Sequence, residues 1–282
     1  MSPVFKAALW MAGWLIATLA MTVAGREVGR DVPIFVLMMF RSSMAVILLL
    51  PFVMATGGIT GRTERFGLHL IRNVVHYGAQ YAWFSALVLI PLAQVISIEF
   101  TLPIWVAVLA FAFLGEHLTF AKITAIALGF AGIIAIVRPG VEAIDAGHLF
   151  ALSSALGFSV SITLTKFLTR TDSPLTVIFY MFAIQTLIGA VPAMMVWQWP
   201  EPQNWVWVAV LGVAGTFSHY CLSSAIQLAD TTIVTPMDFL RVPASALLGY
   251  WLYGEGIDAL TVLGAALILG ANTLNLIRAR RA

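Results

Sequence analysis

The sequence YAWFSALVLIPLAQVISIEFTLPIWVAVLAFAFLGE, residues 81–116, returns in a weaker form as YCLSSAIQLADTTIVTPMDFLRVPASALLGYWLYGE, residues 220–255. One gap-free offset aligns the two copies and places Glu99 on Asp238. Each copy consists of two apolar stretches joined by a very short connection, with one carboxylate inside the second stretch. Similarity at so long a period indicates a duplicated half-domain rather than a solenoid. Duplicated hydrophobic halves are typical of many transporter folds.

The composition indicates a polytopic membrane protein. The 282 residues are 61% hydrophobic and 10% charged, with a mean hydropathy of +0.96, whereas soluble domains are about 45–50% apolar and about 25% charged. The formal net charge is only +2, and the basic residues flank the apolar segments without forming a patch. We therefore expect no nucleic-acid partner. Cys221 is the single cysteine, which excludes an intrachain disulfide.

A helix needs about 20 apolar residues to cross the hydrocarbon core of a bilayer. The first candidate span follows Lys6 and is too long for a signal-peptide core, so we expect it to be retained. The links at Ile90-Pro91 and Ala229-Asp230 are so short that they predict antiparallel hairpins. Ten ranges qualify as spans: 5–25, 32–55, 66–90, 92–114, 120–138, 147–168, 174–197, 204–228, 232–253 and 257–277.

The distribution of basic residues predicts the orientation of these spans. With a cytoplasmic N-terminus, Arg26, Arg30 and Arg138 lie outside, against a larger cytoplasmic set: Lys6, Arg62, Arg65, Lys122, Lys166, Arg170, Arg278, Arg280 and Arg281. The positive-inside rule then places both termini in the cytoplasm. Because each half has an odd number of spans, the second half enters the membrane inverted. We expect two inverted five-helix repeats, residues 1–138 and 147–282, with a substrate site between them near the midplane.

Four charged residues fall inside predicted spans: Arg41, Glu99, Asp238 and Arg241. A charge near the bilayer centre costs about 2.5 kcal/mol or more, so such residues are functional candidates. Arg41 and Glu99 have similar predicted depths, which suggests that they pair. Asp238 and Arg241 share one helix face at i,i+3 spacing and can pair with each other. Two interpretations stay open, namely structural ion pairs that lock helices together and the lining of a transport cavity.

Polar side chains also follow the third span, where Arg72, His76 and Gln80 recur at i+4 steps. His76 falls near the midplane, where an imidazole can bind substrate or titrate near neutral pH. The alternatives are that Arg72 snorkels toward the cytoplasmic headgroups and that His76 makes an interhelical hydrogen bond. The eighth span carries a similar set: Thr216, His219, Ser223 and Gln227.

Aromatic residues accompany these polar groups: Tyr77, Trp83, Phe84, Trp105, Tyr180, Tyr220, Tyr250 and Trp251. Such residues often serve packing or an interfacial belt. Together with polar groups at the midplane, they suit a planar, partly charged organic solute better than a bare ion. Glu116 and Glu255 end the fourth and ninth spans in Gly-Glu pairs, and we expect them to cap or pin the helix that follows.

Motifs for other chemistry are missing from the sequence. It has no GxxxxGK[ST] loop, which disfavours an internal ATPase. It has neither HExxH nor a Cys/His cluster with metal-ligand spacing, and no GxSxG elbow. We therefore expect no catalytic residue, no metal and no cofactor.

The whole chain resembles the EamA-type carriers of the drug/metabolite transporter superfamily. The segments that carry the resemblance are Phe40-Arg41-Ser42-Ser43, Leu70-Ile71-Arg72, Tyr81 to Glu116 and Thr235 to Glu255. The resemblance implies a ten-helix bundle with a central cavity formed by spans one to four and six to nine, with spans five and ten peripheral. The sequence looks closest to the branch with S-adenosylmethionine and riboflavin uptake carriers, in which Arg41 and Arg72 match recurrent arginines.

The expected function is secondary transport of a ring-bearing metabolite such as riboflavin across the bacterial inner membrane. The alternatives are export of amino acids or related metabolites, S-adenosylmethionine transport, and a membrane scaffold or intramembrane enzyme that uses Glu99 and Asp238 as acid and base. The expected partners are the lipid bilayer and a small-molecule substrate, with proton or counter-solute coupling left open. The predicted cavity residues are Arg41, Arg72, His76, Gln80, Trp83, Glu99, His219, Ser223, Asp238 and Arg241.

Overall fold

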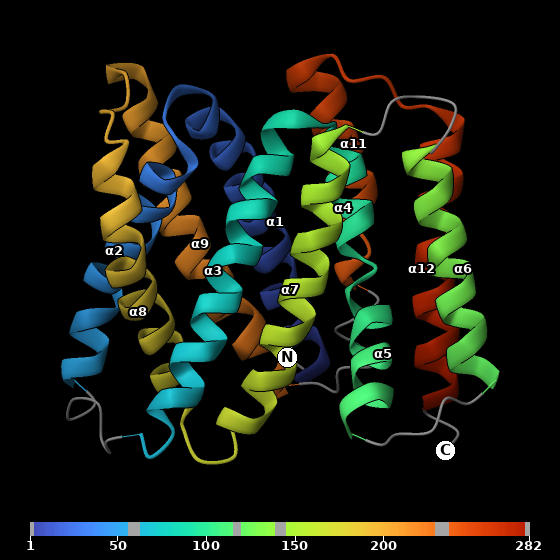
Figure 1. Cartoon of the computed structure of the whole chain (residues 1–282), viewed down its shortest axis with the longest axis horizontal. Helices are drawn as coiled ribbons and strands as arrows, with labels where there is room; N and C mark the ends of the chain where they lie inside the picture. Colours follow the sequence, from blue (N-terminus) through green and yellow to red (C-terminus); the bar gives the residue numbers. More distant parts are fainter. Residues whose placement is uncertain (1–2, 56–62, 115–119, 139–144, 229–236, 280–282) are drawn as a thin grey trace.

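The computed structural model describes residues 3–55, 63–114, 120–138, 145–228 and 237–279, and all regular secondary structure in these ranges is helical (Figure 1). The helices are α1 (Pro3–Asp31), α2 (Ile34–Ala55), α3 (Phe66–Leu89), α4 (Leu92–Glu99), α5 (Leu102–Leu114), α6 (Phe120–Val137), α7 (Ala146–Leu168), α8 (Pro174–Met195), α9 (Trp205–Leu228), α11 (Arg241–Tyr253) and α12 (Ala259–Ala279), with a short 3-10 turn η1 (Pro202–Asn204).

Six described segments are long and apolar enough to cross a bilayer: Phe5–Asp31, Ile34–Ala55, Leu92–Leu109, Ala146–Leu168, Pro174–Met195 and Pro202–Leu222. Large apolar side chains on these helices face outward, among them Ile47, Leu187 and Met195. In water such exposure would be costly, but lipid chains solvate it. The helical class of a membrane protein is therefore confirmed.

Local sequence explains several helix ends. Asp145 caps α7 by accepting a hydrogen bond from the Gly147 N–H. Ser173 caps α8 by accepting a hydrogen bond from the Thr176 N–H, and a proline occupies the first turn of that helix. At the C-terminal end of α11, Gly254 adopts φ 65°, a left-handed conformation that glycine tolerates and that terminates the helix. α1 continues to Asp31, beyond its predicted range, so Arg26 lies within the helix.

The fourth predicted span is broken in its middle. α4 ends at Glu99, a turn follows at Phe100-Thr101, and α5 begins at Leu102. Pro103 has no N–H, so it cannot bond the carbonyl of Glu99 as a continuous helix requires. The Ile104 N–H bonds the Thr101 carbonyl, and the carbonyl of Phe100 instead accepts a hydrogen bond of 2.8 Å from the Asn272 side chain on α12. A neighbouring helix thus satisfies the backbone, as broken membrane helices require.

The ninth span breaks at the equivalent place. Residues 237–238 are helical, a turn follows at Phe239-Leu240, and α11 begins at Arg241. Pro243 removes the N–H that would bond the carbonyl of Phe239. The repeat offset that places Glu99 on Asp238 also places Phe100 on Phe239, so both repeats are interrupted one residue after their buried carboxylate. Residues 229–236 lie outside the described part of the chain.

Helix pairing relates the two halves. α1 packs along α9 and α3 along α7, while α2 packs on α8, α4 on α11 and α6 on α12. Every one of these pairs joins a helix of the first half to one of the second. Exchanging the halves in repeat order turns the pair α1·α9 into α7·α3 and leaves α2·α8 and α6·α12 unchanged. The pair α4·α11 becomes α5 with residues 231–238, of which only 237–238 are described. The interior therefore lies at the interface between the halves.

The pair α6 and α12 lies at one edge of the molecule (Figure 1). A Cβ added to Gly132 would lie 2.7 Å from the carbonyl oxygen of Gly264, and one added to Gly264 would lie 2.6 Å from that of Gly132. Backbones this close require the smallest side chain, as is common where membrane helices pack. The position of these helices agrees with the peripheral place implied for spans five and ten.

Candidate functional site

Two carboxylates, one from each helix break, bind the same guanidinium. Arg241 Nε donates to Asp238 Oδ1 at 2.8 Å, and Nη1 donates to Glu99 Oε1 at 2.9 Å. Trp83 Nε1 donates to the other Glu99 oxygen, Oε2, at 2.9 Å. The predicted Asp238–Arg241 pair is confirmed. We call Glu99, Asp238 and Arg241 the acidic cluster, because two carboxylates and one guanidinium leave a formal charge of −1 when both acids are ionised.

Aromatic rings enclose the acidic cluster. The Arg241 guanidinium lies 5.1 Å from the centre of the Trp14 ring and 4.9 Å from that of Phe100, distances at which a cation is attracted to a ring face. Trp14 on α1 was not among the predicted cavity residues, because its predicted span offers many apolar neighbours and no polar signal. Asn272, which supports the α4–α5 break, was also missed, although it is an amide in a largely apolar span.

Arg41 does not pair with Glu99, so that prediction was wrong. Arg41 lies on α2, is 2% exposed, and its Nε and Nη1 atoms have no hydrogen-bond partner among the described residues. Its guanidinium lies over the Phe182 ring at 5.1 Å. Similar depth on two helices does not bring their side chains together, because α2 packs against α8 and α9 whereas α4 packs against α11.

Arg72 is held inside the protein rather than extended toward the headgroups. It is 7% exposed, its Nε donates to Thr165 Oγ1 at 3.1 Å, and its Nη1 donates to Asn73 Oδ1 at 3.0 Å. The snorkelling alternative is therefore wrong. Its two hydrogen-bond partners are neutral and leave its positive charge uncompensated.

Two histidines lie near these arginines. A hydrogen bond of 2.8 Å joins His76 Nδ1 to the Gln185 side chain on α8, as the interhelical alternative predicted. His219 on α9 meets the Phe182 ring edge-on at 5.8 Å. The Phe182 ring also lies under the Arg41 guanidinium, and His76 follows Arg72 by about one turn of α3. We call Arg41, Arg72, His76 and His219 the cationic cluster. Among the described residues, no hydrogen bond or ion pair joins it to the acidic cluster.

Of the predicted cavity residues that the structure describes, Gln80 joins neither cluster. Gln80 is 4% exposed, and its Oε1 has no hydrogen-bond partner in the described ranges. The Ser223 side chain lies outside the described part of the structure, as do Gln227 and Glu116. Gln185, which sequence reasoning missed, is a fully buried amide in an otherwise apolar span, and that isolation is a signal that could have identified it.

Glu255 holds together the end of the molecule opposite the chain termini (Figure 1). Its Oε1 pairs with Arg26 on α1, and its Oε2 accepts a hydrogen bond of 2.9 Å from the Leu92 N–H at the start of α4. The Tyr253 ring lies 4.4 Å from the Arg26 guanidinium. The expectation that Glu255 pins the following helix, α12, was wrong, since it binds two helices of the other half. This arrangement closes the bundle between α1, α4 and α11.

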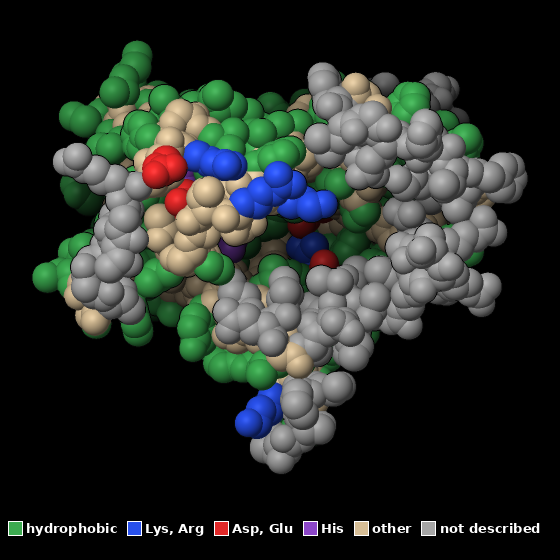
Figure 2. All heavy atoms as spheres, turned by 90° about the horizontal axis from the view of Figure 1, so that it is seen from below, with side chains coloured by type: hydrophobic (Ala, Val, Ile, Leu, Met, Phe, Trp, Pro, Cys, Tyr) green, Lys and Arg blue, Asp and Glu red, His purple; other side chains and the backbone are tan. Residues whose placement is uncertain are grey.

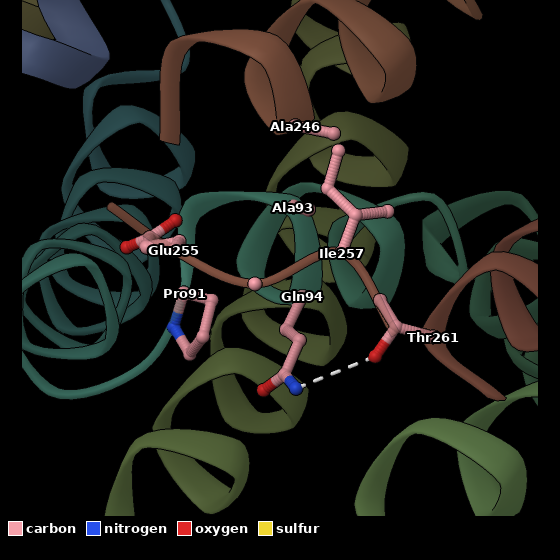
Figure 3. A pocket seen from close by; sticks show the side chains of 8 residues that line it. Pro91, Ala93, Gln94, Ala246, Glu255, Ile257 and Thr261 are labelled. Carbon is pink, nitrogen blue, oxygen red and sulfur yellow. Dashed lines mark hydrogen bonds between the residues drawn. The ribbon is translucent and has the colours of Figure 1, made fainter. Parts of the chain in front are cut away.

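Further polar contacts lie at the same end of the molecule as Glu255. Gln94 on α4 bonds His148 Nε2 at 3.0 Å and Thr261 Oγ1 at 3.4 Å, and with Glu255 it lines a small pocket (Figure 3). Asp258 pairs with Arg138. Burial alone would raise the pKa of the Asp258 carboxyl, but hydrogen bonds from Thr261 and the charge of Arg138 outweigh it, and this pKa lies below its usual value.

The opposite end, which carries both termini, is hollowed. Figure 2 shows a depression near its middle, with acidic and basic side chains visible inside. A hollow with charged side chains at one end of the bundle is consistent with one of the two states of alternating access.

Comparison with known proteins identifies the family. Residues 5–138 and again residues 145–277 match the EamA-like transporter family. The chain belongs to this family. The EamA-like chain is 25% identical over 275 residues to an S-adenosylmethionine uptake transporter of Rickettsia felis, covering 96% of this chain and 94% of that protein. It is 28% identical over 255 residues to a riboflavin transporter of Brucella anthropi, covering 88% and 89% of the two chains.

A solved crystal structure shares the fold. It superposes on this EamA-like chain with a TM-score of 0.66 at 20% identity, covering 99% of this chain and 98% of the other. The family establishes a transporter rather than an enzyme, located as a multi-pass protein in the bacterial inner membrane. The alternatives of an intramembrane enzyme and a scaffold are therefore wrong.

Proposed function

We propose that this EamA-like transporter moves a small organic metabolite across the inner membrane by alternating access, with the acidic cluster at the centre of its cavity. The observation that carries the proposal is the pair of equivalent helix breaks whose carboxylates, Glu99 and Asp238, converge on Arg241. Broken helices at matching places of two repeats are the usual position of substrate and coupling-ion sites in secondary transporters.

A ring-bearing solute, such as riboflavin or S-adenosylmethionine, fits this cavity best. Trp14, Phe100 and Trp83 contact the acidic cluster, and aromatic faces stack on flat rings and attract cations. The names of the two relatives support the same range of solutes. The Rickettsia relative is named an uptake transporter, which supports import as the direction of transport. Observed export of amino acids or related metabolites would replace this proposal.

We further propose ten spans in two inverted repeats, residues 1–138 and 147–282, with both termini in the cytoplasm. The helix pairing between halves supports the inverted relation, and the excess of basic residues that the sequence predicts for the cytoplasmic side supports the orientation. Reporter fusions after Ala282 and near Gly61 are expected to give a cytoplasmic signal, and a fusion near Gly140 a periplasmic one. A periplasmic signal at Ala282 or Gly61 would contradict the inverted arrangement.

The transport proposal is tested with purified protein in proteoliposomes. Labelled riboflavin and S-adenosylmethionine are supplied outside, with and without an inward proton gradient. We expect accumulation of at least one of them, driven by the gradient. Asp238→Asn is expected to retain exchange of solute but to lose gradient-driven accumulation, because it removes a titratable carboxyl while its hydrogen-bonding shape remains.

Glu64→Gln, which removes a carboxylate from an exposed position, is the matched control and is expected to behave as the wild type. Accumulation of neither solute, combined with export of amino acids, would replace the proposed substrate range and direction. Gradient-driven accumulation by Asp238→Asn at the wild-type level would remove this carboxyl from coupling and favour exchange against a counter-solute.

A further inference from the structure

The cationic cluster contains a positive charge that no described group compensates. Arg41 is 2% exposed, yet two of its three guanidinium nitrogens have no hydrogen-bond partner in the described ranges. Its neighbours are the Phe182 ring at 5.1 Å and the backbone of Gly215, where an added Cβ would lie 3.3 Å from Nε. An arginine buried in a membrane protein normally pairs with an acid or with backbone carbonyls. Arg41 is therefore an exception that calls for a partner.

The surroundings of Arg41 exclude a cation and favour an anion. Arg72, about one helical turn from His76 on α3, carries a second positive charge, and its described hydrogen bonds go only to Thr165 and Asn73. No carboxylate of the described residues pairs with either arginine. Like charges in a medium of low dielectric repel strongly, so the site disfavours any cationic group and attracts a negative one.

The two histidines add N–H hydrogen-bond donors to the cluster and are its partly exposed members. His76 accepts the Gln185 amide at Nδ1, so its neutral ring carries a proton on Nε2 and can donate it. His76 and His219 are both partly exposed, in contrast to Arg41 and Arg72. The histidines are thus the more accessible members of the cluster.

We propose that Arg41, assisted by the ring N–H groups of His76 and His219, binds a carboxylate or phosphate group of the transported solute. The planar guanidinium donates two parallel hydrogen bonds to an oxyanion, which gives both strength and orientation. This inference rests on the proposed transport function and narrows its substrate class to solutes with an oxyanion. The amino-acid portion of S-adenosylmethionine has such a group, whereas riboflavin has none at neutral pH.

The test uses the full-length protein in vesicles of neutral phosphatidylcholine, with benzoate and benzamide as probes. These two molecules differ only in the charged group, and chloride salts keep the ionic strength equal. Benzoate is expected to raise the thermal midpoint by about 2 °C at ten times its dissociation constant, and benzamide to leave it unchanged. Equal stabilisation by both probes would overturn the proposal.

Variants of Arg41 assign the effect to this site. Arg41→Met is expected to abolish the benzoate shift and to raise the midpoint without any probe, because it removes an unpaired buried charge. Arg41→Lys keeps the charge and is expected to retain part of the benzoate shift. Arg170→Met, which changes an exposed arginine, is the matched control and is expected to keep the whole shift. A benzoate shift that persists in Arg41→Met would overturn the proposal.

The same thermal measurement distinguishes binding of a solute from binding of other anions. Stabilisation of the wild type by chloride alone, or by phosphatidylglycerol in place of benzoate, would show a halide or lipid site and would overturn binding of the solute. Failure of the transport function has a different signature, namely an Arg41-dependent benzoate shift in a protein that transports neither solute. Full transport of S-adenosylmethionine by Arg41→Met would leave the function intact and overturn this inference.

Discussion

Substitution of Arg241 by methionine is expected to lower the free energy of unfolding by about 3–5 kcal/mol and to abolish transport. Arg241 is 6% exposed and is the shared partner of Glu99 and Asp238, one from each repeat. Removing it leaves two partly buried carboxylates close together without a counter-charge. The measurement is the unfolding midpoint of the purified protein in mixed micelles, together with solute uptake into proteoliposomes.

A triple variant separates structure from function in this cluster. Arg241→Met combined with Glu99→Gln and Asp238→Asn removes every charge of the acidic cluster, and replacing a whole buried ion pair is often neutral for stability. We expect it to regain the stability of the wild type and to remain inactive. Arg170→Met is the control for loss of an exposed arginine. A triple variant that folds and also transports would give these charges an architectural role alone.

Glu255→Gln is expected to shift the protein about 100-fold toward a state open at the end that Glu255 now closes. The side chains of Arg26 and Glu255 are 8% and 11% exposed, and breaking so buried a pair costs about 3 kcal/mol or more, which corresponds to this ratio. The glutamine can still accept the Leu92 N–H, so the start of α4 keeps a partner. The change therefore weakens the contact between α1 and α11 most directly.

Thiol labelling by a reagent that does not cross the membrane measures the opening of this end. Cys221 is first replaced by alanine, and Ser97, whose buried hydroxyl has no hydrogen-bond partner among the described residues, is replaced by cysteine. A membrane-impermeant thiol reagent is expected to modify Ser97→Cys slowly, and much faster when Glu255→Gln is added. Glu201→Gln, at an exposed carboxylate of the same end, is the control. Equal labelling with and without Glu255→Gln would mean that this pair does not hold the closed state.

Much of the fold follows from local features of the sequence. Hydrophobic stretches predict helices because a backbone in lipid must satisfy its own hydrogen bonds. The described helices lie in the predicted ranges, except that α1, α7 and α12 run beyond theirs and the fourth and ninth spans are broken. The Asp238–Arg241 pair was predictable because residues at i,i+3 spacing share a helix face. The helix breaks were less visible, although Pro103 and Pro243 follow the two aligned carboxylates closely.

The partners of the buried charges were decided by tertiary structure. Glu99 binds Arg241 of the other repeat, Arg41 contacts Phe182, and Glu255 binds Arg26 and α4. Depth along a helix can be read from sequence, but the direction in which a side chain points depends on the rotation of each helix and on which neighbour it packs against. The sequence alone thus determined the helices, the duplication and the candidate charges. The packing of one half against the other sorted those charges into an acidic cluster, a cationic cluster and a closed end, because those contacts join residues that no local pattern relates.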